Sequence, residues 1–360
     1  MKAFKKIQYI FLLLCAAALP SCSKFLEIQP KDSVADDQTI FDKASSQTAV
    51  RGIYRGLAAD GYYGVSFPSI GYLSGDNVQW TGSQSIVQQF IDHNVRPENA
   101  TVSTVWTALY NVINRTNNAI AGIPAVNDVT FSTADKNQLI GEAYFVRALA
   151  YFDLARTWGG VQIVTTPTRS ATDKNGIARS TAAQTYAQVL SDLNAAEPLL
   201  TSPTTPNPVR ANKQTVWALK SRYYLYQQDW ANAESFATQV INTTNNYALL
   251  KPYSSWFANN AVGTRESVLE LSYSTTYTNG HRGQWQPPAN GGTRQWAPNA
   301  ALVALLNNPL IGGTRNALIA QTTQGLWYGN LYYRSPATDP AYVIRIAEVY
   351  LNRAEARARQ

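Results

Sequence analysis

Cysteine and histidine are scarce in this sequence, which contains two of each among 360 residues. Cys15 and Cys22 both lie within the first 22 residues, so the rest of the chain carries neither a thiol nor a disulfide. His93 and His281 lie far apart and no His-Glu-x-x-His motif is present, so the spacing of a zinc site is missing. We therefore expect a fold that is stabilised by a large hydrophobic core, with no metal and no cofactor.

Motifs for the common catalytic chemistries are also missing. The sequence has no Gly-x-Ser-x-Gly elbow, no Walker loop, no Gly-x-Gly-x-x-Gly turn and no acidic loop with calcium spacing. Glycosidases need only two carboxylates, which can lie far apart in a sequence, so the 23 acidic residues leave that chemistry open. We favour the interpretation that the protein is not an enzyme, with an anchored hydrolase as the alternative.

Charge is sparse as well, at 15% of the residues against 45% that are hydrophobic. This composition supplies enough apolar side chain for a core and is not typical of a disordered chain. The formal net charge is +7, and three of the positive charges (Lys2, Lys5 and Lys6) lie at the extreme N-terminus. The remaining excess is small and dispersed, which argues against a nucleic-acid partner.

The N-terminal segment has the pattern of an exported lipoprotein. The apolar run from Tyr9 to Leu19 has 11 residues, which is too short to span a bilayer but suits the core of a signal peptide. Leu19-Pro20-Ser21-Cys22 resembles a bacterial lipobox, in which the cysteine is acylated and anchors the protein to a membrane. The sequence thus predicts a signal peptide (1–21), lipidation at Cys22 and a tether leading into the fold (22–45). The alternative is a plain secretory signal with an incidental cysteine.

Most of the remaining chain has the periodicity of helices. Apolar residues recur every three or four positions from Val102 to Ile123 and from Ala134 to Thr157, and the second run ends at Trp158-Gly159-Gly160. Further helices are predicted for 180–196, for 213–227 and 230–242, and for a segment that begins at Tyr342 (342–358). The pair within 213–242 has tetratricopeptide-like spacing, carried by Trp217, Ser221, Tyr224, Ala233 and Val240.

Two stretches, 61–100 and 263–334, lack this periodicity. Ser267–Tyr273 alternates like a strand, and Tyr277–Ala297 is rich in Gly, Pro, Asn, Arg and Trp. Long irregular segments in a compact protein are often functional, so we expect these stretches to form a loop-rich ligand lobe.

The tryptophans divide between these two kinds of segment. Five lie on or beside helical stripes and are expected to pack in the core. The others lie among Gly, Pro, Asn and Gln, where a flat ring can stack on the C–H face of a sugar while nearby amides bind its hydroxyls. The alternative for each of these is a tryptophan that pins down its own loop. The loop tryptophans are Trp80, Trp285, Trp296 and Trp327.

Several blocks of the sequence resemble the SusD/RagB-like lipoproteins of nutrient uptake in Bacteroidota. They begin with Ser23–Pro30, directly after the predicted lipidation site. Glu142–Val161, which contains Trp158-Gly159-Gly160, is similar to the most specific helix of that family, although Gln162 replaces a common proline. Further similar blocks are Tyr186–Ala196, Ala218–Ile241 and Tyr342–Ala356.

The resemblance implies a mostly α fold over residues 46–360, with a tetratricopeptide-type helix-pair scaffold and an irregular ligand lobe. It implies a protein that is anchored at the cell surface in the outer membrane and binds an oligosaccharide or polysaccharide. It also implies delivery of this glycan to a SusC-like TonB-dependent transporter. Two alternatives remain open: a lid that binds peptide, and a repeat scaffold that binds only the transporter.

The resemblance also suggests which residues contact the ligand. Family members often have an aromatic contact near the position of Trp80, and other contacts come from the region of Tyr277–Trp296. The predicted ligand-binding residues are therefore Trp80, Trp285, Trp296, Asn77, Arg282 and Tyr277.

The last predicted helix carries a further expectation. Family members usually continue beyond the block Ala354-Glu355-Ala356 with a helix that pairs with it, whereas this sequence stops at Gln360. We therefore expect a C-terminal truncation and an apolar helix face that lacks its usual cover.

Overall fold

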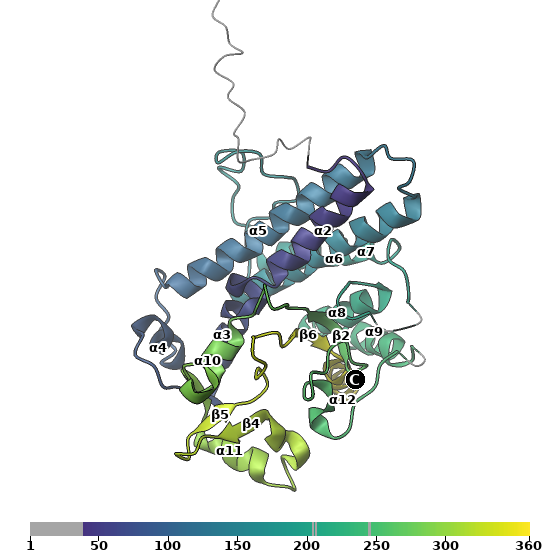
Figure 1. Cartoon of the computed structure of the whole chain (residues 1–360). Helices are drawn as coiled ribbons and strands as arrows, with labels where there is room; N and C mark the ends of the chain where they lie inside the picture. The colour runs from purple at the N-terminus through teal and green to yellow at the C-terminus, as the bar shows by residue number, and fades with distance from the viewer. Residues whose placement is uncertain (1–38, 204, 206, 244–245) are drawn as a thin grey trace, which may run out of the picture. The chain divides into compact units, whose positions relative to one another are not determined.

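The computed structural model describes residues 39–203, 205, 207–243 and 246–360, which Figure 1 draws in colour. The predicted signal peptide, the predicted lipidation site Cys22 and most of the predicted tether lie outside the described residues. Ile40–Gln360 forms a single compact unit. Among the helices of the described part, none combines the length and the hydropathy needed to cross a bilayer.

Three of the four long helices in the first half of the chain confirm the predicted periodicity. α5 (Ala100–Gly122), α6 (Thr133–Trp158) and α7 (Ala182–Ala196) lie where the sequence predicts them. α2 (Lys43–Leu57) was not predicted, and it packs against α5 and α6. Figure 1 shows α2 and α5 lying side by side, with α6 and α7 next to them.

α6 is the central element of this group. Ser132 caps its first turn by accepting a hydrogen bond from the backbone N–H of Asp135. Nearly every side chain between Leu139 and Ala155 is buried, because α5 covers one side of the helix and α7 another. A helix that is mostly apolar all round is expected to be buried in this way.

The predicted tetratricopeptide-like pair is also present. α8 (Lys213–Tyr226) and α9 (Trp230–Ile241) pack against each other, and Gln228 takes a left-handed conformation (φ 59°) in the tight turn between them. α12 (Ile346–Arg359) packs on both and buries Val349 and Ala356. Leu351 of the same helix is 70% exposed.

The start of the last predicted helix is wrong. The helix begins at Ile346 rather than Tyr342, because Ala341–Arg345 forms strand β6 instead. This strand pairs antiparallel with β2 (Ser267–Leu271), which confirms the strand predicted near 267–273. Val268 and Leu269 of β2 are fully buried in the main core, so this part of 263–334 belongs to the scaffold and not to a ligand lobe.

The remaining irregular stretches contain short elements. We call residues 65–99 and 279–332 the lobe, and Figure 1 shows much of it below the long helices. Strand β1 (Val78–Trp80) pairs with β3 (Trp296–Pro298), and β4 (Ile319–Gln321) pairs with β5 (Trp327–Gly329), all antiparallel. The elements of the lobe are α3 (Ser66–Leu73), β1 (Val78–Trp80), α4 (Ser85–Ile91), α10 (His281–Trp285), β3 (Trp296–Pro298), α11 (Ala300–Asn307), β4 (Ile319–Gln321) and β5 (Trp327–Gly329), with 3₁₀ turns η6 (Pro288–Asn290) and η7 (Gly313–Leu318). The scaffold adds the π-helical turn η3 (Asp60–Gly64) and the 3₁₀ turns η4 (Ile123–Ala125) and η5 (Tyr253–Trp256).

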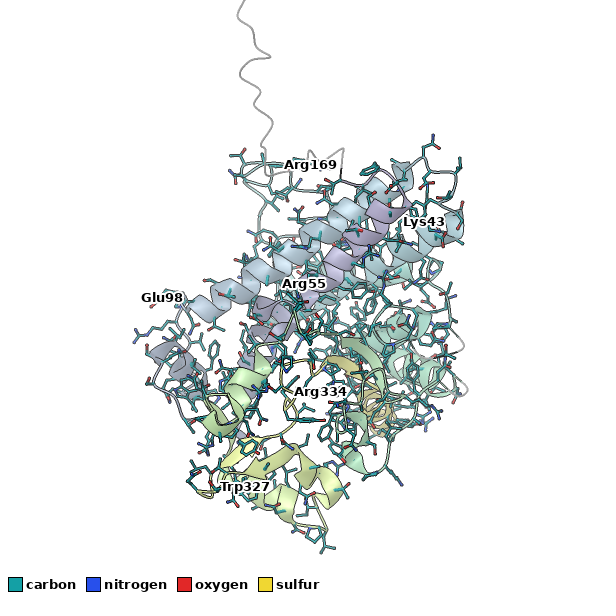
Figure 2. The ribbon with its side chains drawn as sticks, viewed as in Figure 1. Lys43, Arg55, Glu98, Arg169, Trp327 and Arg334 are labelled. Carbon is teal, nitrogen blue, oxygen red and sulfur yellow. The ribbon has the colours of Figure 1, made fainter. Side chains whose placement is uncertain are left out.

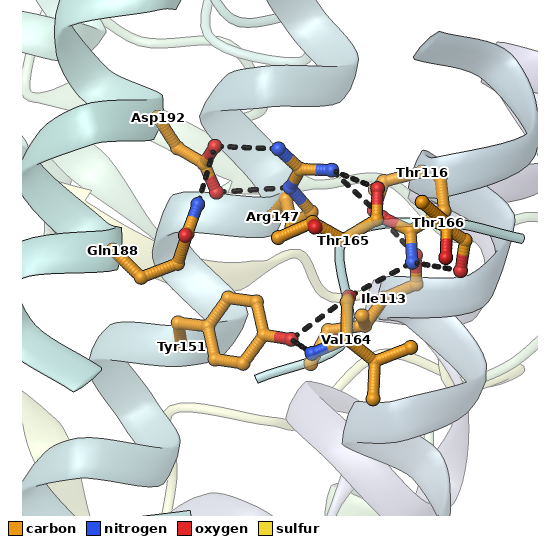
Figure 3. A network of polar contacts seen from close by, with 10 residues as sticks. Ile113, Thr116, Arg147, Tyr151, Val164, Thr165, Thr166, Gln188 and Asp192 are labelled. Carbon is orange, nitrogen blue, oxygen red and sulfur yellow. Dashed lines mark hydrogen bonds and ion pairs between the residues drawn. The ribbon is translucent and has the colours of Figure 1, made fainter. Parts of the chain in front are cut away.

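A buried ion pair ties the central helices together (Figure 3). Arg147 of α6 donates from Nε and Nη2 to the two carboxylate oxygens of Asp192 in α7, at 2.9 and 2.7 Å. Its Nη1 donates to Oδ1 of Asn117 in α5 at 2.8 Å. Asn117 in turn donates to the carbonyl oxygens of Val164 and Thr166. A charge that is removed from water needs such complete pairing, so this network fixes how the three helices pack.

Candidate functional site

Three of the predicted ligand-binding residues meet in the lobe. Because β1 and β3 pair, Trp80 lies directly opposite Trp296, although the two are far apart in the sequence. Trp285 on α10 contacts Trp296, with their ring centroids 5.7 Å apart. Tyr72 of α3 packs against Trp285 at 5.6 Å and against Trp296 at 5.3 Å. We call Tyr72, Trp80, Trp285 and Trp296 the aromatic cluster.

Trp296 is the buried centre of this cluster. It is only 5% exposed and packs with Leu73 and Phe90 in a second, smaller hydrophobic core. Its indole Nε1 is buried and has no hydrogen-bond partner among the described residues. The structure thus corrects the expectation of an exposed stacking platform at Trp296, because strand pairing places the ring against α3 and α4.

Trp80 lies at the edge of the cluster and borders a polar groove. The groove has a volume of 420 Å³ and runs along α4 and the loop after it. The backbone at Gly82 lies so close to the Trp80 ring that a Cβ atom there would overlap it, so the loop needs glycine at this position. The groove is lined by Trp80, Gly82, Ser83, Gln84, Ser85, Gln88, Gln89, Asp92, Asn94 and Arg96, and we call it the Trp80 groove.

Some polar side chains of the Trp80 groove are held in place by the protein. Gln88 donates to Asp92 at 2.8 Å. The Oε1 atom of Gln89 accepts from the Arg96 N–H and from the Asn99 side chain, each at 3.0 Å.

Other side chains of the same groove have their polar atoms available. Within the described part of the chain, the side chains of Gln84, Asn94 and Arg96 have no hydrogen-bond partner. The groove therefore combines a fixed aromatic ring with free amide and guanidinium groups, an arrangement that suits a ligand rich in hydroxyl groups.

Trp285 borders a different hollow, on the side of the cluster that faces α11. This cavity has a volume of 390 Å³, and the backbone of Gly329 lies against the Trp285 ring. Its lining is almost entirely apolar, in contrast to the Trp80 groove. We call it the Trp285 cavity, and it is lined by Pro68, Tyr72, Val78, Trp285, Pro298, Leu302, Leu306, Leu318, Ile319, Gly329, Leu331 and Tyr332.

The other predicted ligand residues lie outside these two hollows. Asn77 is exposed directly before β1, where its carbonyl oxygen accepts a hydrogen bond from the Asn299 N–H at 3.0 Å. Arg282 donates to the carbonyl oxygens of Asn290 and Gly291, so it stabilises the turn that follows α10.

Tyr277 does not join the aromatic cluster. It packs against the main core, where it stacks on Tyr273 with ring centroids 6.2 Å apart and contacts Arg55 of α2. The prediction that Tyr277 lies together with the loop tryptophans is therefore wrong. Trp327, which Figure 2 labels in the lobe, is half-buried and accepts a hydrogen bond at its carbonyl oxygen from Arg294.

A chain of buried polar contacts connects the lobe to the scaffold. Asp153 of α6 is fully buried and accepts hydrogen bonds from the hydroxyls of Tyr62 and Tyr63, at 2.6 and 2.7 Å. The carbonyl oxygen of Tyr63 accepts from Nε2 of His281 at 3.0 Å. The His281 ring stacks on the ring of Tyr332, with centroids 4.2 Å apart, and Tyr332 lines the Trp285 cavity. These contacts connect the wall of the cavity at Tyr332 to the buried central helix α6.

Burial controls protonation along this chain of contacts. It lowers the pKa of His281 to about 4, so the imidazole is neutral at physiological pH. Burial also raises the pKa values of Tyr72 and Tyr332 well above their usual range, so both hydroxyls keep their protons. Within the described residues, no group of three or more Asp, Glu, His or Cys side chains converges to hold a metal ion.

The sequence analysis did not predict Tyr72 or the residues along α4 as part of the site. The signal for the first set was the run of Gln, Ser and Asn that follows Trp80, in which Gln84, Gln88 and Gln89 recur at helical spacing. Tyr72 gave no comparable signal, because its contacts come from segments more than 200 residues away in the chain.

Comparison with known proteins agrees with this architecture. A family profile described as "Starch-binding associating with outer membrane", for SusD-like proteins, matches residues 24–225. SusD-like protein P38 of Formosa agariphila is 30% identical over 288 residues, which cover 77% of this chain and 54% of that protein. SusD-like protein P2 of the same organism is 26% identical, over 78% of this chain and 55% of its own length. The chain thus spans little more than half the length of these relatives.

Solved structures show the same fold. A SusD superfamily protein of Bacteroides thetaiotaomicron superposes with a TM-score of 0.77 at 26% identity, over 88% of this chain and 76% of that one. A protein described as a putative sugar binding protein of Bacteroides vulgatus gives a TM-score of 0.78 at 24% identity, over 89% and 75% of the two chains. A laminarin-binding SusD-like protein gives 0.75 at 20% identity, over 88% and 80%.

Proposed function

This chain belongs to the SusD-like family of carbohydrate-binding proteins, and on that premise we propose that it captures a glycan in the Trp80 groove. The observation that carries the proposal is the position of Trp80 beside side chains that have no protein partner. A sugar offers an apolar C–H face to an aromatic ring, while its hydroxyl groups need both donors and acceptors. The amides of Gln84 and Asn94 supply both, and Arg96 supplies donors.

The surrounding groove favours a neutral or weakly charged saccharide. Asp92 and Arg96 bring one charge of each sign to its lining, so no strong field of one sign selects a polyanion. The groove volume of 420 Å³ falls within the range of about 300–1,000 Å³ that is usual for small-ligand sites. A short saccharide segment fits this description better than the surface of a macromolecule.

We further propose that the protein delivers this glycan to a SusC-like TonB-dependent transporter. The support is the resemblance of its sequence blocks to SusD/RagB-like lipoproteins and the lipobox-like segment that ends at Cys22. Acylation of Cys22 would hold the protein at the surface of the outer membrane. Labelling with a clickable fatty acid tests this step, which fails if label incorporation survives Cys22→Ala.

Calorimetry with a panel of polysaccharides that includes starch and laminarin tests glycan capture. We expect at least one glycan to bind, and Trp80→Ala to weaken its binding at least tenfold. Trp80→Phe keeps a smaller ring and should weaken it less. The matched control is Trp230→Ala, because Trp230 lies on α9 outside the lobe. Unchanged binding in Trp80→Ala would place the glycan elsewhere.

Two further outcomes separate the alternatives. Co-purification with a transporter in the absence of any glycan or peptide binding would favour a scaffold that binds only protein. New reducing ends after incubation of the purified protein with a glycan would indicate a hydrolase instead. We expect neither outcome.

A further inference from the structure

The Trp285 cavity is unsuitable for a bare sugar. Its lining contains no charged side chain, and leucine, isoleucine, valine and proline side chains form most of its walls. A sugar hydroxyl that enters such a space loses its hydrogen bonds to water and gains none in return. The cavity therefore selects an apolar group, whereas the Trp80 groove selects a polar one.

The aromatic walls favour a flat apolar group. Trp285 and Tyr72 meet at an interplanar angle of 48°, and Tyr332 also lines the cavity, with one face of its ring covered by His281. Flat rings pack well in offset or edge-to-face contact with such walls. The volume of 390 Å³ accommodates a single aromatic substituent, and the apolar lining rather than the size excludes a bare saccharide.

Hydrogen-bonding groups are present at one position of this cavity. The hydroxyl of Tyr332 has no partner among the residues that the structure describes. The hydroxyl of Tyr72 is 3.5 Å from Nδ1 of His281, which is a long and weak contact. Both residues line the cavity. They offer hydrogen bonds to a phenol or an ester oxygen on the ring that enters.

The cavity and the Trp80 groove both border strand β1. Val78 lines the cavity and Trp80 lines the groove, and the two residues alternate with Gln79 along β1. Residues two apart in a strand face the same side and lie about 7 Å from each other. A substituent that extends along β1 from a saccharide in the groove would therefore run toward the cavity.

We propose that the Trp285 cavity binds an aromatic ester group carried by the glycan, such as a hydroxycinnamoyl group. This inference rests on the proposed function of the groove and narrows it, since the preferred ligand becomes an aryl-decorated saccharide. The ring packs between Trp285, Tyr72 and Leu302, and its polar oxygen binds the hydroxyl of Tyr332.

Methyl ferulate tests the cavity without any sugar. By ligand-observed NMR and calorimetry, we expect it to bind the wild-type protein, and Leu302→Trp, which fills the cavity, to weaken binding at least tenfold. Leu310→Trp is the matched control, because Leu310 follows α11 and is 94% exposed. Tyr332→Phe keeps the ring and should weaken binding about threefold, which tests the hydroxyl even if Leu302→Trp unfolds. Absence of binding to the wild-type protein, or equal binding to Leu302→Trp in its folded state, would overturn the proposal.

A feruloylated arabinoxylo-oligosaccharide and its saponified form test whether groove and cavity act on one ligand. The esterified form should bind at least tenfold more tightly to the wild-type protein, and Leu302→Trp should abolish this ratio. Equal affinities for the two forms would overturn the link between the sites. If glycans bind but methyl ferulate does not, the cavity proposal fails and the proposed function stands. If methyl ferulate binds but no glycan does, the proposed function fails and only the binding of an aromatic group in the cavity stands.

Discussion

Three buried polar side chains at the centre of the helical scaffold bind one another, whereas in the lobe several polar side chains line a groove without a partner among the described residues. In the scaffold, Arg147, Asp192 and Asn117 satisfy one another across three helices. In the lobe, Gln84 and Asn94 line the Trp80 groove and have no partner in the described part of the chain. The scaffold thus uses its polar groups to fix a shape, and the lobe keeps some of them available for a ligand.

The same contrast divides the tryptophans of the lobe. Trp296 is buried and holds the aromatic cluster together, while Trp80 keeps part of its surface at the groove. Substitutions in the two regions should therefore separate stability from binding. The expected effects range from a large change in the free energy of unfolding to a small change in affinity.

Removal of the buried guanidinium of Arg147 should have the largest effect. Arg147→Ala leaves the Asp192 carboxylate buried without its charged partner, which should cost about 3–5 kcal/mol of unfolding free energy. The measurement is urea denaturation followed by circular dichroism. Arg357→Ala serves as the control, since Arg357 pairs with Glu234 at the surface and should contribute no more than about 1 kcal/mol. Similar losses for both variants would show that the buried network has no special role.

A pH titration should detect the buried link between scaffold and lobe. Burial lowers the pKa of His281 to about 4, while the unfolded chain binds the proton near its ordinary pKa of 6.5. The unfolded state therefore holds more protons between these values, so stability is complete above pH 6.5 and falls as the pH drops toward 4. The loss between about pH 7 and about pH 4.5 should be about 2–3 kcal/mol.

Two histidine variants separate the contribution of His281 to the pH dependence of stability from that of other titrating groups. His281→Asn should lose the part of the pH dependence that belongs to the imidazole, whereas His93→Asn should keep it, because His93 is exposed. Asparagine also tolerates the left-handed conformation at position 93 (φ 51°). An unchanged pH profile in His281→Asn would contradict the assignment.

Phenylalanine substitutions compare the two paired tryptophans directly. Trp296→Phe removes an indole N–H that is buried without a partner, which offsets the loss of packing, so stability should change by less than about 1.5 kcal/mol. Glycan affinity should stay within about twofold of wild type. Trp80→Phe should leave stability unchanged and weaken the glycan about threefold, because the stacking surface shrinks. A larger binding defect in Trp296→Phe would mean that the buried ring contacts the ligand.

Most long helices of the scaffold could be predicted from the sequence, but α2, β6 and the arrangement of the lobe could not. α5, α6, α7, α8 and α9 each repeat an apolar stripe over three or more turns, which is a strong local signal. The shorter helices α3, α4 and α11 contain too few turns for a periodic pattern to emerge. β6 was mistaken for helix because its partner β2 lies about 75 residues earlier, and local periodicity carries no information about such pairing.

The candidate site shows the same limit. Composition identified Trp80, Trp285 and Trp296 as unusual loop residues, and the structure brings them together. Which ring is buried and which borders a hollow depends on the pairing of β1 with β3, which no local pattern specifies. Tyr277 shares a loop with Trp285 in the sequence but packs against the main core, so proximity in sequence was misleading there.

The smallest expected effect belongs to the free amides of the Trp80 groove. Asn94→Ala removes one donor and one acceptor that no described residue uses, so stability should change by no more than about 0.5 kcal/mol. Glycan affinity should fall two- to fivefold, since a net hydrogen bond contributes about 0.5–1.5 kcal/mol. Asn307→Ala at the exposed end of α11 is the control and should alter neither quantity. If Asn94→Ala binds glycan as tightly as wild type, the ligand does not reach this end of the groove, and the contacts lie closer to Trp80 and Gln84.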